Sequence, residues 1–344
     1  MPQKRVLALS LSLAAAVAVS GLGAPAAHAA PAAGCVYKPT ILPLPAGATG
    51  GNATRSGAKD VFGGTVTIAG AADAHAAVWK DGTVTDLGTV PGANTAPNVN
   101  AVNSSGVVVG SAFNITGGDD GWPSGYLVPF RSRDGKLEAL PLPGGVSGLA
   151  PTAISDAGDI YASTRSENPN LDTVYVWPAD RPGTVIKAPG FPAGSKVKGV
   201  DSDGTVAVTV ESDVDATWRP YTVKNGVAKA LPLPVGAPNA QVTGISNGRA
   251  VGIGLTSRSS FGVVWDQDGT AKKLTGSIEA YGISPTGLIF GYGKSNTLWQ
   301  LTTPKGTVPG DGYVNALTPD NALIGHAPVP GTPDSMYPAI WHCS

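Results

Sequence analysis

Short aliphatic runs alternate with clusters of turn-forming residues along the chain, and this alternation repeats. One copy, residues 100–110 (NAVNSSGVVVG), consists of a polar residue, a small-aliphatic pair, a turn and an aliphatic run that ends in glycine. Similar segments occupy residues 152–162, 198–208, 243–252, 281–291 and 315–325, and a looser first copy occupies residues 53–63. Aliphatic runs on both sides of a turn predict a two-stranded hairpin, so we expect seven such hairpins.

A second hairpin is expected after each first one. Its leading strand ends in tryptophan in five copies, and we expect Phe130 and Val223 in this position in the other two. The five are Trp79, Trp177, Trp265, Trp299 and Trp341. Turns such as Asp81-Gly82 follow, and they are strong hairpin signals. Four strands per unit, with copies that end 34 to 52 residues apart, predict an all-β fold, a seven-bladed β-propeller of four-stranded antiparallel blades. The tryptophans are expected to pack between blades.

The last blade is expected to be closed by the N-terminal part of the mature chain. The seventh unit has no outer strand after Trp341, whereas residues 40–45 (TILPLP) match the Leu-Pro-Leu-Pro segments at residues 140–143 and 231–234. We therefore expect residues 40–45 to complete this blade and Cys35 to form a disulfide with Cys343. The loop that this disulfide closes, roughly 310 residues long, corresponds to a stabilisation of about 5 kcal/mol in the chain-entropy model.

The N-terminal residues 1–29 have the features of a signal peptide. Lys4 and Arg5 precede an apolar run at residues 6–19, and Ala27-His28-Ala29 matches the small-residue pattern of a cleavage site. We expect cleavage after residue 29 or 30, a single propeller domain at residues 30–344, a secreted monomer and no membrane span. Residues 32–35 also weakly resemble a lipobox, in which Cys35 would be lipidated, but the expected leucine is missing.

Charge and motif content narrow the function classes. Only 14% of residues are charged and the net charge is −1, so no basic surface for nucleic acid is expected. The chain has no Gly-x-Ser-x-Gly motif, no phosphate loop and no histidine spacing typical of a metal site, so no cofactor or metal site is predicted. Two acidic clusters, Asp119-Asp120 and the series Glu211, Asp213 and Asp215, carry oxygen ligands suited to calcium, or form solvated loops.

A row of polar residues is expected to line the central channel, because it lies two positions before the aliphatic residue of each innermost strand. The row consists of Asn100, Thr152, Lys198, Thr243, Tyr281 and Asn315. It varies in residue type, so Asn100, Lys198, Tyr281 and Asn315 are candidate ligand-binding residues, with solvated channel lining as the alternative. A second row is expected to bond the backbone of the turns: Asn103, Ser155, Asp201, Ser246, Ser284 and Thr318.

Trp122 is a further candidate, because it lies outside the tryptophan register in a long Gly/Asp-rich loop at residues 112–125. An aromatic ring in such a loop either stacks on a sugar or a partner protein, or folds back over its own blade. We expect a binding face that combines Trp122 with Lys198 or Tyr281, provided that they open on the same side of the ring.

The segment at residues 75–92 (HAAVWKDGTVTDLGTVPG), continued by residues 101–110, resembles the extracellular HAF-repeat family. The family triplet is degraded to His75-Ala76-Ala77 here, and the Asn-x-x-Gly part is kept at Asn103 and Gly106. The resemblance implies an exported, propeller-like repeat protein and supplies no biochemical function.

The leading functional hypothesis is a secreted, non-enzymatic binding or scaffolding module for an extracellular carbohydrate or protein. The alternative is a secreted carbohydrate-active enzyme, a glycosidase or polysaccharide lyase, with its site at the channel mouth. Such an enzyme would need carboxylates or a Tyr/Lys set from different blades, and Glu279, Asp201, Lys198 and Tyr281 are the candidates.

Overall fold

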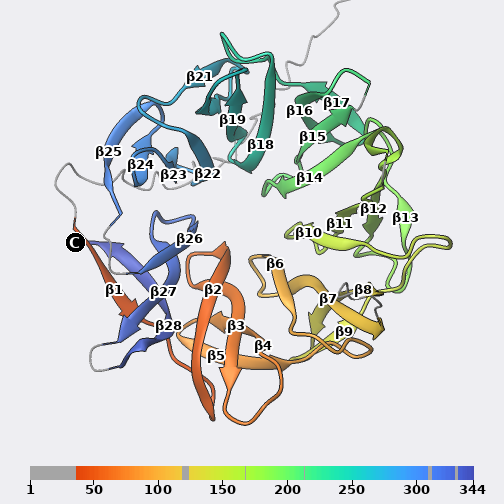
Figure 1. Cartoon of the computed structure of the whole chain (residues 1–344), viewed down its shortest axis with the longest axis vertical. Coiled ribbons are helices and arrows are strands. Elements are labelled where there is room, and N and C mark those ends of the chain that lie inside the picture. The colour runs from red at the N-terminus through yellow and green to blue at the C-terminus, as the bar shows by residue number, and fades with distance from the viewer. Residues whose placement is uncertain (1–35, 118–123, 167, 213, 309–311, 330–331) are drawn as a thin grey trace, which may run out of the picture.

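The computed structural model describes residues 36–117, 124–166, 168–212, 214–308, 312–329 and 332–344. Within these residues the strands form seven four-stranded antiparallel sheets, arranged as a ring around a central channel (Figure 1). This architecture confirms the predicted seven-bladed β-propeller. The one helical element in this part of the chain is the single 3₁₀ turn η1 (Pro169–Leu171), and no helix there is long and apolar enough to cross a membrane.

Each blade contains four strands, which in blades 1 to 6 follow the chain order from the channel outward. Blade 1 contains β2 (Ala48–Ala58), β3 (Val61–Ile68), β4 (His75–Lys80) and β5 (Thr83–Gly88). Blade 2 contains β6 (Asn98–Val102), β7 (Val108–Gly117), β8 (Ser124–Arg133) and β9 (Lys136–Ala139). Blade 3 contains β10 (Ala150–Ile154), β11 (Ile160–Ser163), β12 (Val174–Trp177) and β13 (Ile186–Lys187). Blade 4 contains β14 (Ser195–Val200), β15 (Val206–Ser212), β16 (Thr217–Lys224) and β17 (Val227–Ala230). Blade 5 contains β18 (Asn239–Ser246), β19 (Arg249–Leu255), β20 (Ser260–Trp265) and β21 (Ala271–Lys273). Blade 6 contains β22 (Glu279–Ile283), β23 (Leu288–Tyr292), β24 (Asn296–Gln300) and β25 (Thr303–Thr307).

Blade 7 is completed by the N-terminal strand, as predicted. Its strands, from the channel outward, are β26 (Tyr313–Leu317), β27 (Leu323–Val329), β28 (Thr332–Cys343) and β1 (Tyr37–Ile41). The strand begins earlier than expected and ends before Pro43, because proline lacks the N–H that would continue the ladder. Tyr37 pairs with Cys343. Cys35 lies outside the described residues, as does the whole predicted signal peptide, so the disulfide stays a prediction.

The five tryptophans of the repeat pack between blades, as expected, and four of them also link neighbouring blades by hydrogen bonds. Three indole N–H groups each donate at 2.8 Å to a proline carbonyl in the outer-strand segment of the preceding blade: Trp79 to Pro43, Trp177 to Pro141 and Trp265 to Pro232. Trp299 donates in the same way to the carbonyl of Thr275 at 2.9 Å. The Leu-Pro-Leu-Pro segments therefore supply acceptors that hold the next blade in place.

The assignment of Phe130 to the tryptophan position of blade 2 is wrong. Phe130 pairs with Gly110, so the residue that matches the tryptophans is Ser132, two residues later. Phe130 is fully buried, and a Cβ at Gly110 would lie 2.8 Å from its ring, so glycine provides the space for the phenylalanine. The hydroxyl of Ser132 accepts a hydrogen bond from the Val108 N–H at 2.8 Å. Val223 does occupy the corresponding position in blade 4.

Candidate binding site in the central channel

The innermost strand of every blade carries a β-bulge at the same position. Each bulge leaves one residue out of the ladder, and the seven residues are Thr54, Asn100, Thr152, Lys198, Thr243, Tyr281 and Asn315. A bulge bends the strand and redirects the side chain of the extra residue. All but Thr54 line one channel cavity of about 530 Å³, which we call the polar chamber. The predicted polar row therefore does line the channel.

Some side chains of this row connect neighbouring blades. Three of them donate a hydrogen bond to the carbonyl of the residue that precedes the bulge in the next blade: Asn100 to Pro151 at 2.9 Å, Thr243 to Ala280 at 2.6 Å and Asn315 to Ala53 at 3.1 Å. The amide N–H₂ groups of Asn100 and Asn315 thus have a structural role. Ligand binding by their amide oxygens stays a prediction.

The other candidates in the row make no such link. Lys198 has no hydrogen bond or ion pair within the described residues, and burial lowers its pKa against the opposing effect of Glu211. The Tyr281 hydroxyl donates to the carboxylate of Glu279, and burial together with this carboxylate raises the pKa of Tyr281. The hydroxyl of Thr152 is buried without a partner in the same part of the structure. In the described structure, the side chains of these three residues therefore make no hydrogen bond to a neighbouring blade.

Arg55 is a channel residue that the repeat pattern did not reveal. The position after the bulge is alanine or glycine in six blades, namely Ala101, Ala153, Gly199, Gly244, Gly282 and Ala316, but arginine in blade 1. The Arg55 Nε donates to the carbonyl of Asn100 at 2.6 Å, and its Nη1 donates to the carbonyl of Thr54 at 2.8 Å. Burial lowers the pKa of this guanidinium. When Thr54 of the first copy is aligned with the bulge residues of the other copies, Arg55 falls at the position that is alanine or glycine elsewhere.

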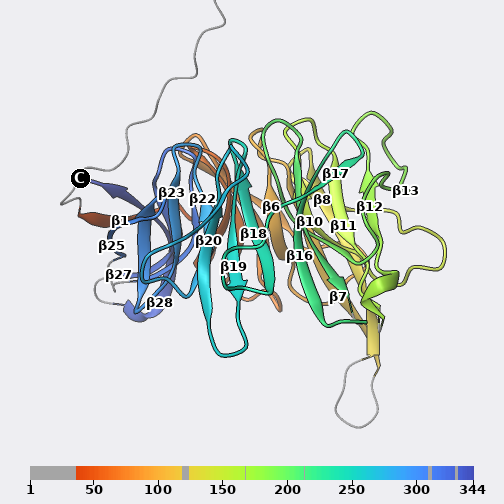
Figure 2. The same cartoon turned by 90° about the horizontal axis from the view of Figure 1, so that it is seen from above.

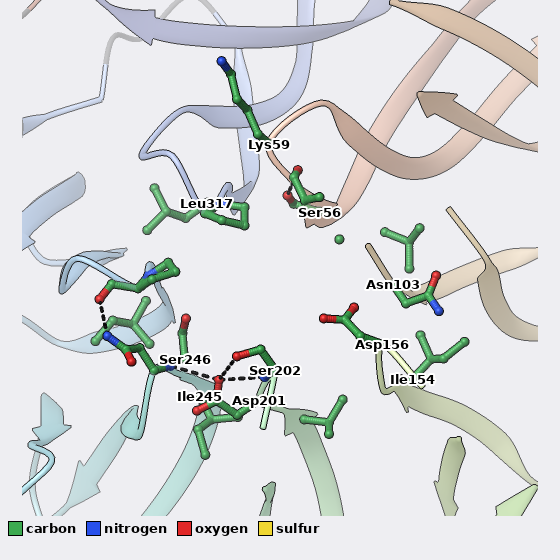
Figure 3. Close-up of a pocket in the computed structure, with 18 of the residues that line it drawn as sticks. Ser56, Lys59, Asn103, Ile154, Asp156, Asp201, Ser202, Ile245, Ser246 and Leu317 are labelled. Carbon is green, nitrogen blue, oxygen red and sulfur yellow. Dashed lines mark hydrogen bonds between the residues drawn. The ribbon is translucent and has the colours of Figure 1, made fainter. Parts of the chain in front are cut away.

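An aliphatic girdle divides the channel. It lies two positions after the bulges and consists of Val102, Ile154, Val200, Ile245, Ile283 and Leu317, with Ser56 in blade 1. These residues line both the polar chamber and a larger cavity of about 850 Å³ at the turns between the first and second strands of the blades. We call it the turn-side cavity (Figure 3). The girdle is therefore the boundary between a polar half and a turn-lined half of the channel.

Most polar side chains of the second predicted row serve the turns, as expected. Four of them accept a hydrogen bond from the backbone N–H four residues later: Asn103, Ser155, Ser284 and Thr318. Asp201 instead accepts from the N–H groups of Asn247 and Gly248 in the next blade at 2.9 and 2.7 Å. In the turn-side cavity, Asp156 projects towards the centre and Lys59 points away from it (Figure 3). Although this cavity is larger, it offers fewer uncommitted polar groups than the polar chamber.

The ends of β7 and β8 that flank residues 118–123 lie on the same side of the ring as the polar chamber. The bulges precede the girdle, so the chamber is at the end of the ring where the innermost strands begin and where the antiparallel second strands end. β7 and β8 extend beyond the ring at that end (Figure 2). Trp122 itself, together with Asp119 and Asp120, lies outside the described residues, so its contribution to a binding face stays a prediction.

The remaining candidates do not form a metal site in the described part of the chain, which holds no group of three or more His, Cys, Asp or Glu side chains suited to a metal ion. In the second acidic series, Asp213 lies outside the described residues and Asp215 accepts a hydrogen bond from the Thr217 hydroxyl at 2.7 Å. His75, the histidine of the HAF-like segment, contacts the carboxylate of Asp86 at 2.9 Å in the outer half of blade 1.

Comparisons with known proteins agree with the fold. No family model and no curated protein sequence matches the chain. Among solved structures, the chain is similar to a streptogramin B lyase (TM-score 0.53, 15% identity, 90% of this chain and 98% of that one). It is also similar to the β-propeller domain of the trilobed protease from Pyrococcus furiosus (TM-score 0.54, 9% identity, 86% and 95%).

A third likeness is to an acylaminoacyl peptidase from Pyrococcus horikoshii (TM-score 0.50, 12% identity). The matched region covers 83% of this chain and 51% of the peptidase. The chain thus spans about half the length of that enzyme. These likenesses establish the propeller fold. At such low identity they carry no activity across.

Proposed function

We propose that this protein is an exported, non-enzymatic binding module whose ligand enters the polar chamber. The observation that carries the proposal is the convergence, in one chamber, of two side chains from different blades that make no hydrogen bond to a neighbouring blade in the described structure: Lys198 from blade 4 and Tyr281 from blade 6. Binding sites are typically concave and carry a few such polar groups. The signal-peptide pattern of residues 1–29 supports export, and the ligand would be an extracellular carbohydrate or a secreted protein.

The enzymatic alternative has less support from the geometry. Of its candidate residues, Asp201 lies on the turn side of the girdle with its carboxylate bonded to backbone N–H groups, whereas Lys198 and Tyr281 line the polar chamber. A general base works best when its pKa is near the working pH, but burial and Glu279 raise the pKa of Tyr281 away from neutrality. The four candidates therefore do not assemble into one catalytic set.

A plug in the chamber tests the proposal. Gly282 lines the chamber, has an ordinary backbone conformation and has no atom within 4 Å of a Cβ built on it, so Gly282→Trp should fill the chamber without strain. Gly144 is equally open but lies in the exposed connection between blades 2 and 3, so Gly144→Trp is the matched control.

The mature chain is used to capture ligands from a glycan array and from culture supernatant of the source organism. We expect Gly282→Trp to lose the captured ligand and Gly144→Trp to retain it, with both variants folded by circular dichroism. Equal capture by the two variants, or no capture by the parent chain, would contradict the proposal. Turnover of a polysaccharide that depends on Glu279 or Tyr281 would favour the enzymatic alternative.

A further inference from the structure

The charged side chains that line the polar chamber are all positive. Among the described residues that form its wall, Arg55 and Lys198 are the charged ones. Two carboxylates act on the wall from outside it: Glu279 accepts a hydrogen bond from the Tyr281 hydroxyl, and Glu211 raises the pKa of Lys198. The whole chain carries a net charge of −1, so this local excess of positive charge does not follow from overall composition. A concave, partly water-excluded site with charges of one sign attracts ligands of the opposite sign.

Arg55 is anchored in a way that leaves donors for a ligand. Its Nε and Nη1 bonds go to two backbone carbonyls, which fix the guanidinium but do not neutralise it. A guanidinium has five N–H donors, so three have no partner among the described residues. Its planar arrangement of donors matches the two oxygens of a carboxylate.

Lys198 supplies a second cation from another blade. It has no ion pair, although Lys196, two residues earlier on β14, is paired with the buried carboxylate of Asp172. Lys196 and Arg165 add to the positive potential around Lys198, and Glu211 opposes it. Lys198 is exposed and Arg55 is partly buried, so both cations can be reached by an incoming anion, which would gain an ion pair with each.

The neutral groups of the chamber suit a sugar ring. Tyr281 is 39% exposed, and its ring centroid lies 5.5 Å from that of Phe290, so the chamber wall carries two neighbouring aromatic rings. The amide oxygens of Asn100 and Asn315 have no hydrogen-bond partner in the described structure and can accept from hydroxyl groups. The volume of about 530 Å³ is within the usual range for small-ligand sites.

We propose that the polar chamber recognises the carboxylate of a uronic acid unit in an extracellular acidic glycan, with Arg55 and Lys198 as the anion-binding residues. This inference rests on the proposed binding function and names its ligand class. The carboxylate lies between the two cations, and the sugar ring packs against Tyr281. An acidic peptide would satisfy the cations, and its backbone N–H groups could donate to the amide oxygens, but a glutamate side chain has no ring that would pack against Tyr281.

The test measures binding of uronate trisaccharides, such as trigalacturonate, by calorimetry at pH 7 and low salt. The same trisaccharide as its methyl ester is the chemical control, because it keeps the shape and lacks the charge. We expect the ester to bind about tenfold more weakly or worse, as for loss of a hydrogen bond to a charged group. Hexaglutamate is the probe for the acidic-peptide outcome.

Lys198→Ala should weaken trigalacturonate binding about tenfold, and Lys198→Arg should restore most of it. Lys229→Ala, which removes an exposed lysine from the outer strand β17 of the same blade, should leave binding unchanged. Equal affinity for acid and ester, an unaffected Lys198→Ala variant, or binding of hexaglutamate but no uronate would overturn the inference. Those outcomes leave the binding function itself to the Gly282→Trp comparison, so the two failures are distinguishable.

Discussion

Replacing Trp79 with phenylalanine should destabilise the ring more than the same replacement at Trp341. Both residues are buried, at 2% and 1% exposure, and both lie near the end of the third strand of their blade. The Trp79 Nε1–H donates to the Pro43 carbonyl at 2.8 Å, whereas the Trp341 Nε1–H is buried without a partner in the described structure. Phenylalanine lacks this N–H group, so only the exchange at Trp79 breaks a hydrogen bond.

The magnitude follows from what the two exchanges share. Both remove the same volume from a buried interface between blades, so the packing cost is similar and largely cancels in the comparison. The exchange at Trp79 loses about 1 kcal/mol of hydrogen bonding and leaves the Pro43 carbonyl unpaired, whereas the exchange at Trp341 removes an unsatisfied donor that costs about 1–3 kcal/mol. The free energies of unfolding should therefore differ by about 2 kcal/mol or more.

The assay is guanidinium unfolding of the two variants and the parent at pH 7, supported by calorimetry. For a chain with roughly 310 folded residues, a difference of 2 kcal/mol corresponds to about 3 °C in Tm. Trp177→Phe and Trp265→Phe act as replicates of the hydrogen-bonded class, because their indoles donate to Pro141 and Pro232. Equal losses at Trp79 and Trp341, or a larger loss at Trp341, would refute the reasoning.

Three other predictions concern stability. Reduction of the predicted Cys35–Cys343 disulfide should lower Tm in calorimetry and leave the circular dichroism of the folded chain unchanged. Thr152→Val should stabilise the chain by about 1 kcal/mol in denaturant unfolding, because it removes a buried hydroxyl without a partner. Hydrogen bonds, the strongest from Lys272, lower the pKa of Asp266 to about 2. The contribution of Asp266 to the free energy of unfolding is therefore present above its ordinary pKa of 3.8 and is lost as pH falls towards 2. Asp266→Asn should flatten this part of the curve of stability against pH.

The number of blades and the closure by the N-terminal strand could be predicted because their signals are local. Turn glycines, aliphatic runs and the Leu-Pro-Leu-Pro segments each report on a few neighbouring residues, and their order along the chain determines the topology. The tryptophan position of blade 2, which was assigned to Phe130 but is occupied by Ser132, shows the limit of this reasoning. The two residues share a face of β8, and the space that decides between them is provided by Gly110 on a neighbouring strand.

The candidate site was predictable in its position and less so in its composition. The row that contains Lys198 and Tyr281 could be found because it keeps a fixed distance from the aliphatic girdle. Arg55 was missed because the first copy is irregular and because a bulge adds a residue without any sequence signature of its own. The hydrogen bonds that occupy Asn100 and Asn315 depend on the spacing between blades, which a single repeat does not encode.

The bulges also bear on how such a ring could acquire new specificity. A residue at a bulge takes no part in the strand ladder, so its replacement changes neither the register nor the direction of the neighbouring side chains. At Thr152, Lys198 and Tyr281 no inter-blade hydrogen bond depends on the side chain either. A library that varies only these three positions would therefore sample different ligand chemistries on one unchanged scaffold.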